Sequence, residues 1–127
     1  MWAQAVFVFI GGGFGAAIRE FLMLLIPQQS ASFPLDIFTA NIVASFFLGL
    51  ASGLHSWGDV SDEFMLLVGT GLAGGMSTFS SFVFGVYSEA VSPNEIGLAV
   101  LYCVSSLIVG FTAVWLGLQL GKRAQRT

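Results

Sequence analysis

Four long apolar runs divide the chain, and short polar segments separate them. The runs cover residues 5–26, 37–54, 64–88 and 96–120. The last three contain no Asp, Glu, Lys or Arg, and only Arg19 and Glu20 interrupt the first. Each run is close to the roughly 20 residues that a helix needs to cross a hydrocarbon core about 30 Å thick. The pattern predicts an all-α membrane protein whose single domain, residues 1–127, contains four transmembrane helices.

The polar segments contain residues that are typical of helix starts. Pro34 and Asp36 suit the first turn of the second helix. The amide hydrogens of a first turn have no partner within the helix, so proline, which has no amide hydrogen, loses no bond there. The carboxylate of an aspartate complements the positive charge of the helix N-terminus. Asp62 and Glu63 favour the start of the third helix for the same electrostatic reason. We therefore expect a helix to begin near each pair.

The segment SPNE at residues 92–95 resembles a capping box. In this arrangement a serine caps the helix, proline occupies the first helical position and a glutamate returns to the cap. We therefore predict that the fourth helix begins here, with Ser92 as the N-cap, Pro93 as the first helical residue and Glu95 bonded back to the cap.

The composition agrees with a membrane protein. Charged residues make up 9% of the chain, whereas a soluble domain carries about 25%. The one cysteine, Cys103, has no disulfide partner, and the one histidine, His55, lies at a loop edge without a cysteine or paired carboxylates around it. Because no phosphate-binding or nucleic-acid pattern occurs either, we expect neither an enzyme nor a nucleic-acid partner.

Positive charge gives a weak indication of orientation. With four spans, both termini and the loop at residues 55–63 share one side, and that side holds Lys122, Arg123 and Arg126. The other two loops contain no Lys or Arg, so the positive-inside rule predicts cytoplasmic termini. A bias of three residues also fits a chain that inserts in both orientations.

Two polar side chains in the first two runs need an explanation, because a charge at membrane depth is costly. Arg19 either snorkels to the interface or donates hydrogen bonds to backbone carbonyls inside a bundle. Asn41 and Ser45 lie on one helix face, four residues apart. Asn41 either makes an interhelical hydrogen bond or lines a polar site.

Smaller signals occur in the first and fourth runs. Gly11 and Gly15 have the GxxxG spacing that lets two helices approach closely, which indicates helix packing. Tyr102, Ser106 and Thr112 bring hydroxyl groups to the fourth run. Hydroxyls in membrane helices often bond only to their own backbone, so this set alone is weak support for a polar pathway.

The third run contains GTGLAGGMSTFSSF, residues 69–82, with four glycines and five hydroxyl side chains. Glycine weakens a helix, so we predict a break near Gly74–Thr78. Broken membrane helices use freed carbonyls to bind cations and their N-terminal ends to face anions. The positive ring edges of Phe79 and Phe82 could also face an anion, or the two rings could be a packed pair beside a glycine kink.

Three motifs resemble the Fluc/CrcB family of fluoride channels. They are GGGFGAAIR (11–19), ANIVASFFLG (40–49) and GLAGGMSTFSSF (71–82), in an order and spacing that agree over nearly the whole chain. The resemblance implies an antiparallel, dual-topology homodimer with two fluoride pathways and a central structural Na⁺.

The resemblance also implies roles for individual residues. Seven match the fluoride pathway: Asn41, Phe79, Ser81, Phe82, Tyr102, Ser106 and Thr112. Gly74 and Ser77 match residues whose backbone carbonyls bind Na⁺, and Arg19 matches an arginine of the first helix. The chain departs from the family pattern at Glu20, Asp36, Ile37, Ala44, Val83 and Gly85.

The expected function is passive, selective fluoride export through the inner membrane of a bacterium. A proton-coupled multidrug antiporter is the main alternative, with Glu20 as its membrane carboxylate. A membrane scaffold without transport activity, in which the glycines only pack helices, is a third possibility. Neither alternative accounts for all three motifs.

Overall fold

The computed structural model describes residues 2–26, 33–56, 58 and 60–124. Its elements are α1 (Trp2–Leu25), α2 (Leu35–His55), α3 (Asp62–Phe64), the π-helix η1 (Met65–Ala73), α4 (Gly74–Met76), α5 (Phe79–Val91) and α6 (Ile96–Ala124). Four stretches of the described chain are long and apolar enough to cross a membrane: Trp2–Leu25, Leu35–His55, Asp62–Val91 and Ile96–Ala124. The prediction of four spanning helices is therefore confirmed.

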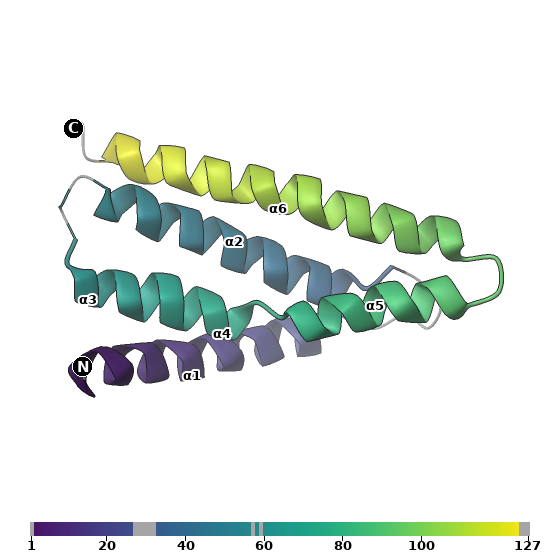
Figure 1. The fold of residues 1–127 in the computed structure, drawn as a ribbon, viewed down its shortest axis with the longest axis horizontal. Helices are drawn as coiled ribbons and strands as arrows, with labels where there is room; N and C mark the ends of the chain where they lie inside the picture. The colour runs from purple at the N-terminus through teal and green to yellow at the C-terminus, as the bar shows by residue number, and fades with distance from the viewer. Residues whose placement is uncertain (1, 27–32, 57, 59, 125–127) are drawn as a thin grey trace.

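Helix α2 lies at the centre of the bundle (Figure 1). It packs along α6 on one side and against η1 on the other. Helix α1 packs against η1 and α4, while α5 packs against α6. Trp2 at the start of α1 and Ala124 at the end of α6 lie at the same end of the bundle (Figure 1).

Glycines bring α2 and α6 into backbone contact. Gly49 and Gly53 of α2 face Gly117 and Gly121 of α6, and each pair has the GxxxG spacing. A methyl group added at any of the four would collide with backbone atoms of the facing helix. Small residues are effective here because lipid is as apolar as leucine, so helices in a membrane gain stability from close approach.

The same device joins α1 to the third span. A methyl group at Gly11 would collide with the carbonyl of Leu67, and one at Gly15 with the carbonyl of Leu72. Gly75 of α4 in turn contacts the backbone of α1. The interpretation of Gly11 and Gly15 as a helix-packing pair is confirmed.

Two of the three predicted helix starts are confirmed. Pro34 is the N-cap residue of α2, and Asp36 lies in its first turn. Asp62 and Glu63 begin the third span, behind Ser61, whose hydroxyl accepts the amide hydrogen of Phe64 at 3.3 Å. These carboxylates stand where the helix end is positive.

The prediction for residues 92–95 is wrong. Ser92 is the C-cap of α5 and not the N-cap of α6, because the Ser92 carbonyl accepts the Glu95 amide hydrogen at 3.2 Å and closes a turn. Pro93 and Asn94 occupy the central positions of that turn, and Asn94 has a φ of 66°. Proline followed by a residue with positive φ is the preference of a type II turn. Helix α6 begins at Ile96 instead.

We expect Gly117→Ala to lower the free energy of unfolding by roughly 1–3 kcal/mol, the usual range for overpacking, because the added methyl group meets the backbone of α2. Unfolding of the purified protein in one detergent measures this. Gly97→Ala is the matched control, since a methyl group there has nothing within 4 Å and also lies in α6. Equal losses in the two variants would contradict the role of Gly117.

Candidate functional site

The third span is broken close to its middle. Ser77 (φ −74°, ψ 151°) and Thr78 (φ −145°, ψ 110°) are extended, between the end of α4 and the start of α5. The predicted break at Gly74–Thr78 is confirmed, although Gly74 itself keeps helical dihedral angles. The preceding nine residues, Met65–Ala73, form a π-helix, a geometry that often occurs at functional sites.

Asn41 of α2 bonds to both backbone groups at the break. Its Nδ2 donates to the carbonyl oxygen of Thr78 at 3.3 Å, and its Oδ1 accepts the amide hydrogen of Thr78 at 2.7 Å. A backbone group left unpaired in hydrocarbon costs several kcal/mol, so this pair of bonds makes the break tolerable at that depth. The interhelical interpretation of Asn41 is confirmed, and its partner is backbone.

The side chain of Thr78 caps α5. Its Oγ1 accepts the amide hydrogen of Ser81 at 3.3 Å, as an N-cap residue does, and donates to Ser81 Oγ at 3.0 Å. Ser80 Oγ lies 3.4 Å from the same Thr78 oxygen. Three hydroxyl groups therefore meet at the positive end of a 13-residue helix.

The break also releases carbonyl groups of α4. In a continuous helix the amide of Thr78 would bond to Gly74, but here it bonds to Asn41. Among the described residues, the Gly74 carbonyl then accepts only a long hydrogen bond, 3.4 Å, from Ser77 Oγ. Arg19 Nη1 donates to the carbonyl oxygen of Gly75 at 3.4 Å. Arg19 is half-buried, and this bond to a backbone carbonyl of the third span favours the bundle alternative.

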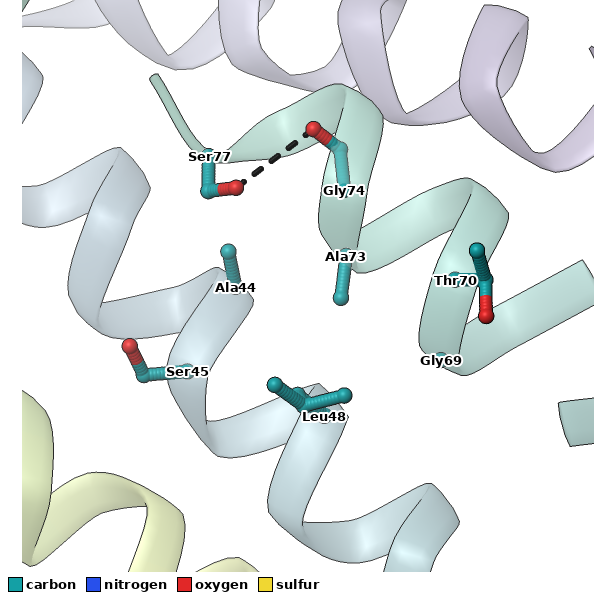
Figure 2. A pocket seen from close by; sticks show the side chains of 8 residues that line it. All are labelled: Ala44, Ser45, Leu48, Gly69, Thr70, Ala73, Gly74 and Ser77. Carbon is teal, nitrogen blue, oxygen red and sulfur yellow. Dashed lines mark hydrogen bonds between the residues drawn. The ribbon is translucent and has the colours of Figure 1, made fainter. Parts of the chain in front are cut away.

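A pocket of about 300 Å³ lies beside the released Gly74 carbonyl. Figure 2 shows α2 on one side, with Ala44, Ser45 and Leu48, and η1 and α4 on the other. The third-span lining consists of Gly69, Thr70, Ala73, Gly74 and Ser77. The described residues contain no group of three His, Cys, Asp or Glu side chains able to hold a metal ion, so oxygen ligands here would be carbonyls and hydroxyls.

A row of aromatic rings extends from the break to α6. The ring centroids of Phe79 and Phe82 lie 6.2 Å apart, and those of Phe82 and Tyr102 lie 5.4 Å apart. Phe33 meets Tyr102 edge to face at 5.1 Å. Phe79 is 79% exposed and Tyr102 is fully buried, so the row leads from the molecular surface into the bundle.

The predicted residues of α6 do not all join this row. The hydroxyl groups of Tyr102 and Ser106 are buried, and neither has a hydrogen-bond partner among the described residues. Thr112 instead is exposed and donates to the carbonyl oxygen of Ile108 in its own helix at 2.8 Å. Within one copy, the structure brings Asn41, Ser81, Phe82 and Tyr102 near the break and leaves Thr112 apart.

The sequence analysis counted the hydroxyls of Thr78 and Ser80 in the segment 69–82 without assigning them to the site, and it missed Phe33. A signal for the first two was present, because a threonine followed three residues later by a serine after a predicted break suits an N-cap. Phe33 lies next to Pro34, in a segment read only as a turn. Its contact with Tyr102 spans too much sequence for a local pattern to indicate.

Comparison with known proteins adds an independent observation. Residues 6–118 match the family described as "CrcB-like protein, Camphor Resistance (CrcB)". The chain belongs to the CrcB family. Every residue proposed for its site lies inside the matched region.

Several named proteins are similar to this chain along most of its length. "Fluoride-specific ion channel FluC 3" of Yersinia pseudotuberculosis is 49% identical over 118 residues, which cover 93% of this chain and 88% of that protein. "Fluoride-specific ion channel FluC" of Pyrococcus furiosus is 39% identical, covering 94% and 97%. "Fluoride-specific ion channel FluC 1" of Brucella abortus is 41% identical over 94% of this chain, but the match spans only 44% of that protein.

We expect Asn41→Leu to destabilise this CrcB protein by roughly 1–3 kcal/mol, because the Thr78 amide is left unpaired while the Thr78 carbonyl still accepts the Phe82 amide hydrogen. Faster hydrogen–deuterium exchange at the Thr78 amide should accompany the loss of stability. Gln4→Leu, which removes an exposed amide from α1, serves as the control. Unchanged exchange at Thr78 in Asn41→Leu would show that the two bonds do not hold the break.

Proposed function

We propose that this chain forms a fluoride-selective channel that exports cytoplasmic fluoride passively across a bacterial inner membrane. The names of its CrcB relatives support this, since those proteins are described as fluoride-specific ion channels. The physical observation that carries the proposal is the N-terminus of α5. This helix N-terminus lies near the middle of a 30-residue apolar span, with hydroxyl groups around it.

The end of α5 is suited to an anion. The amide of Ser81 bonds to Thr78 Oγ1 and that of Phe82 bonds to the Thr78 carbonyl, whereas the amides of Phe79 and Ser80 have no acceptor within the described chain. Free amides and the helix dipole together favour negative charge at a helix N-terminus. Because the break lies deep in the span, an anion could meet these groups inside the membrane.

Selectivity for fluoride requires replacement of a tight hydration shell. In a narrow path, hydroxyl donors and the positive ring edges of Phe79 and Phe82 take the place of the water molecules in that shell. The buried hydroxyls of Tyr102 and Ser106 continue the path. No energy source is needed. Fluoride that enters as the weak acid HF ionises inside, and the membrane potential drives the anion out with about 2.3 kcal/mol per 100 mV.

The working unit that we propose is an antiparallel homodimer. Thr70, Ser77 and Ser80 are exposed on the third span, next to the strongly exposed ring of Phe79. Lipid offers hydroxyl groups no hydrogen-bond partner, so a second copy is a better cover for this face. The three basic residues near the C-terminus orient the chain only weakly, which suits insertion in both directions.

A structural Na⁺ fits the released carbonyls of this dimer. Gly74 and Ser77 would contribute backbone oxygens, and the Gly74 carbonyl accepts only one long hydrogen bond. The pocket of about 300 Å³ that Gly74 and Ser77 help to line offers room for an ion. The ion would supply positive charge that holds the two broken spans together.

The antiporter alternative has less support. Glu20 is exposed on α1, and its neighbour Arg19 is directed toward Gly75. The named relatives are ion channels, and such proteins need no catalytic residue. The scaffold alternative gives no role to the Phe79 and Ser80 amides, which have no acceptor among the described residues.

Fluoride efflux from liposomes tests the proposal. Vesicles that contain the purified chain and a K⁺ gradient should release fluoride when valinomycin is added, as measured with a fluoride electrode, and should retain chloride. Phe79→Leu combined with Phe82→Leu should abolish the release if the ring edges line the path. Phe9→Leu, which changes an exposed ring of α1, is the control. Equal release of chloride, or full fluoride release by the double variant, would contradict these roles.

Removal of Na⁺ should weaken the dimer and lower fluoride flux together. Exchange of Na⁺ for N-methyl-D-glucamine during purification, followed by light scattering and by the efflux assay, measures both quantities. Restoration of the dimer when Na⁺ returns is expected. A dimer that forms equally well without Na⁺ would argue against carbonyl ligation by Gly74 and Ser77.

A further inference from the structure

We propose that Thr78 is a positioning residue that turns the Ser81 hydroxyl into an outward donor for the conducted anion. The inference rests on the proposed function, and it assigns a task to a residue of the segment 71–82 that is not among the predicted pathway residues. Its basis is the direction of the hydrogen bonds around a single oxygen atom, Thr78 Oγ1.

A hydroxyl group has one hydrogen to donate and two lone pairs to accept with. Thr78 Oγ1 accepts the Ser81 amide hydrogen at 3.3 Å and donates its own hydrogen to Ser81 Oγ at 3.0 Å. Its remaining lone pair faces Ser80 Oγ at 3.4 Å, so Ser80 is the donor in that contact. The three hydroxyls form one directed chain from Ser80 through Thr78 to Ser81.

The direction of this chain determines what Ser81 can do. Because Ser81 Oγ accepts from Thr78, its own hydrogen points elsewhere, and no acceptor for it occurs among the described residues. Linked hydroxyls polarise one another, so the last one in the chain is the stronger donor. That donor lies at the N-terminus of α5, where negative charge is favoured.

Thr78 can hold this direction because it is itself held. Asn41 bonds to both its amide hydrogen and its carbonyl oxygen, which fixes the backbone from which the side chain extends. Ser80 has no such support, since its hydroxyl contacts only Thr78. A path from α2 to the anion therefore runs from the Asn41 amide through Thr78 to the Ser81 hydroxyl.

A double-mutant cycle with Thr78→Val and Ser81→Ala tests the proposal in the liposome assay. Valine keeps the shape of threonine but removes both the donor to Ser81 Oγ and the acceptor of the Ser81 amide, and we expect fluoride flux to fall roughly tenfold, as for the loss of one hydrogen bond to a charged group. The fluoride-to-chloride flux ratio should fall with it. Thr78→Ser should recover most of both quantities. If Thr78 acts through Ser81, the double variant is no worse than Ser81→Ala alone.

Several outcomes would overturn the proposal while leaving the channel function intact. Thr78→Val with wild-type flux and selectivity is one, and additive losses in the double variant are another. Absence of fluoride flux in the wild-type protein would instead contradict the proposed function itself. Ser52→Ala is the matched control, because that hydroxyl bonds only to the carbonyl of Leu48 in its own helix. Should Thr78→Val fail to fold, Thr78→Asp preserves the cap but cannot donate, and wild-type flux in that variant would overturn the proposal.

Discussion

The two hydrogen bonds between Asn41 and the backbone of Thr78 are the constraint on which the rest of the structure depends. A spanning helix normally satisfies all its own backbone groups, and hydrocarbon offers no replacement when it does not. One amide side chain, presented by the central helix α2, supplies both a donor and an acceptor at the point where the third span is extended. Both backbone groups of Thr78, at a break inside the membrane, thereby form hydrogen bonds within one chain.

The state of the Gly74 carbonyl and the new helix start at Phe79 both accompany these two hydrogen bonds. Because the Thr78 amide is engaged by Asn41, the Gly74 carbonyl is left with a single long contact. Because a new helix, α5, begins at Phe79, a positive helix N-terminus lies inside the membrane, where the Thr78 side chain caps it. The carbonyl end of α4 and the amide end of α5 thus lie on opposite sides of the extended residues Ser77 and Thr78, and the proposed cation and anion sites rest on this arrangement.

Local patterns in the sequence predicted the elements well and their long-range partners less well. Run length and the absence of charge located four spans, and the glycine-rich segment located the break, because both properties belong to a single stretch of chain. Residues 92–95 were misread, since Ser92 and Pro93 suit a turn as well as a capping box, and the chain reversal between α5 and α6 decides between them. The Asn41–Thr78 bonds, the four glycines joining α2 and α6, and the separation of Thr112 from Tyr102 depend on which helix faces are in contact.

The placement of both chain ends at one end of the bundle has a consequence for covalent architecture. With four crossings among the described residues, Ala124 of an inserted copy is on the same side of the membrane as Trp2. Two copies in opposite orientations therefore present the end of one and the beginning of the other to different compartments. A single polypeptide that joined such a pair in tandem could not do so with a water-soluble linker. It would need an odd number of additional membrane-crossing segments between the halves.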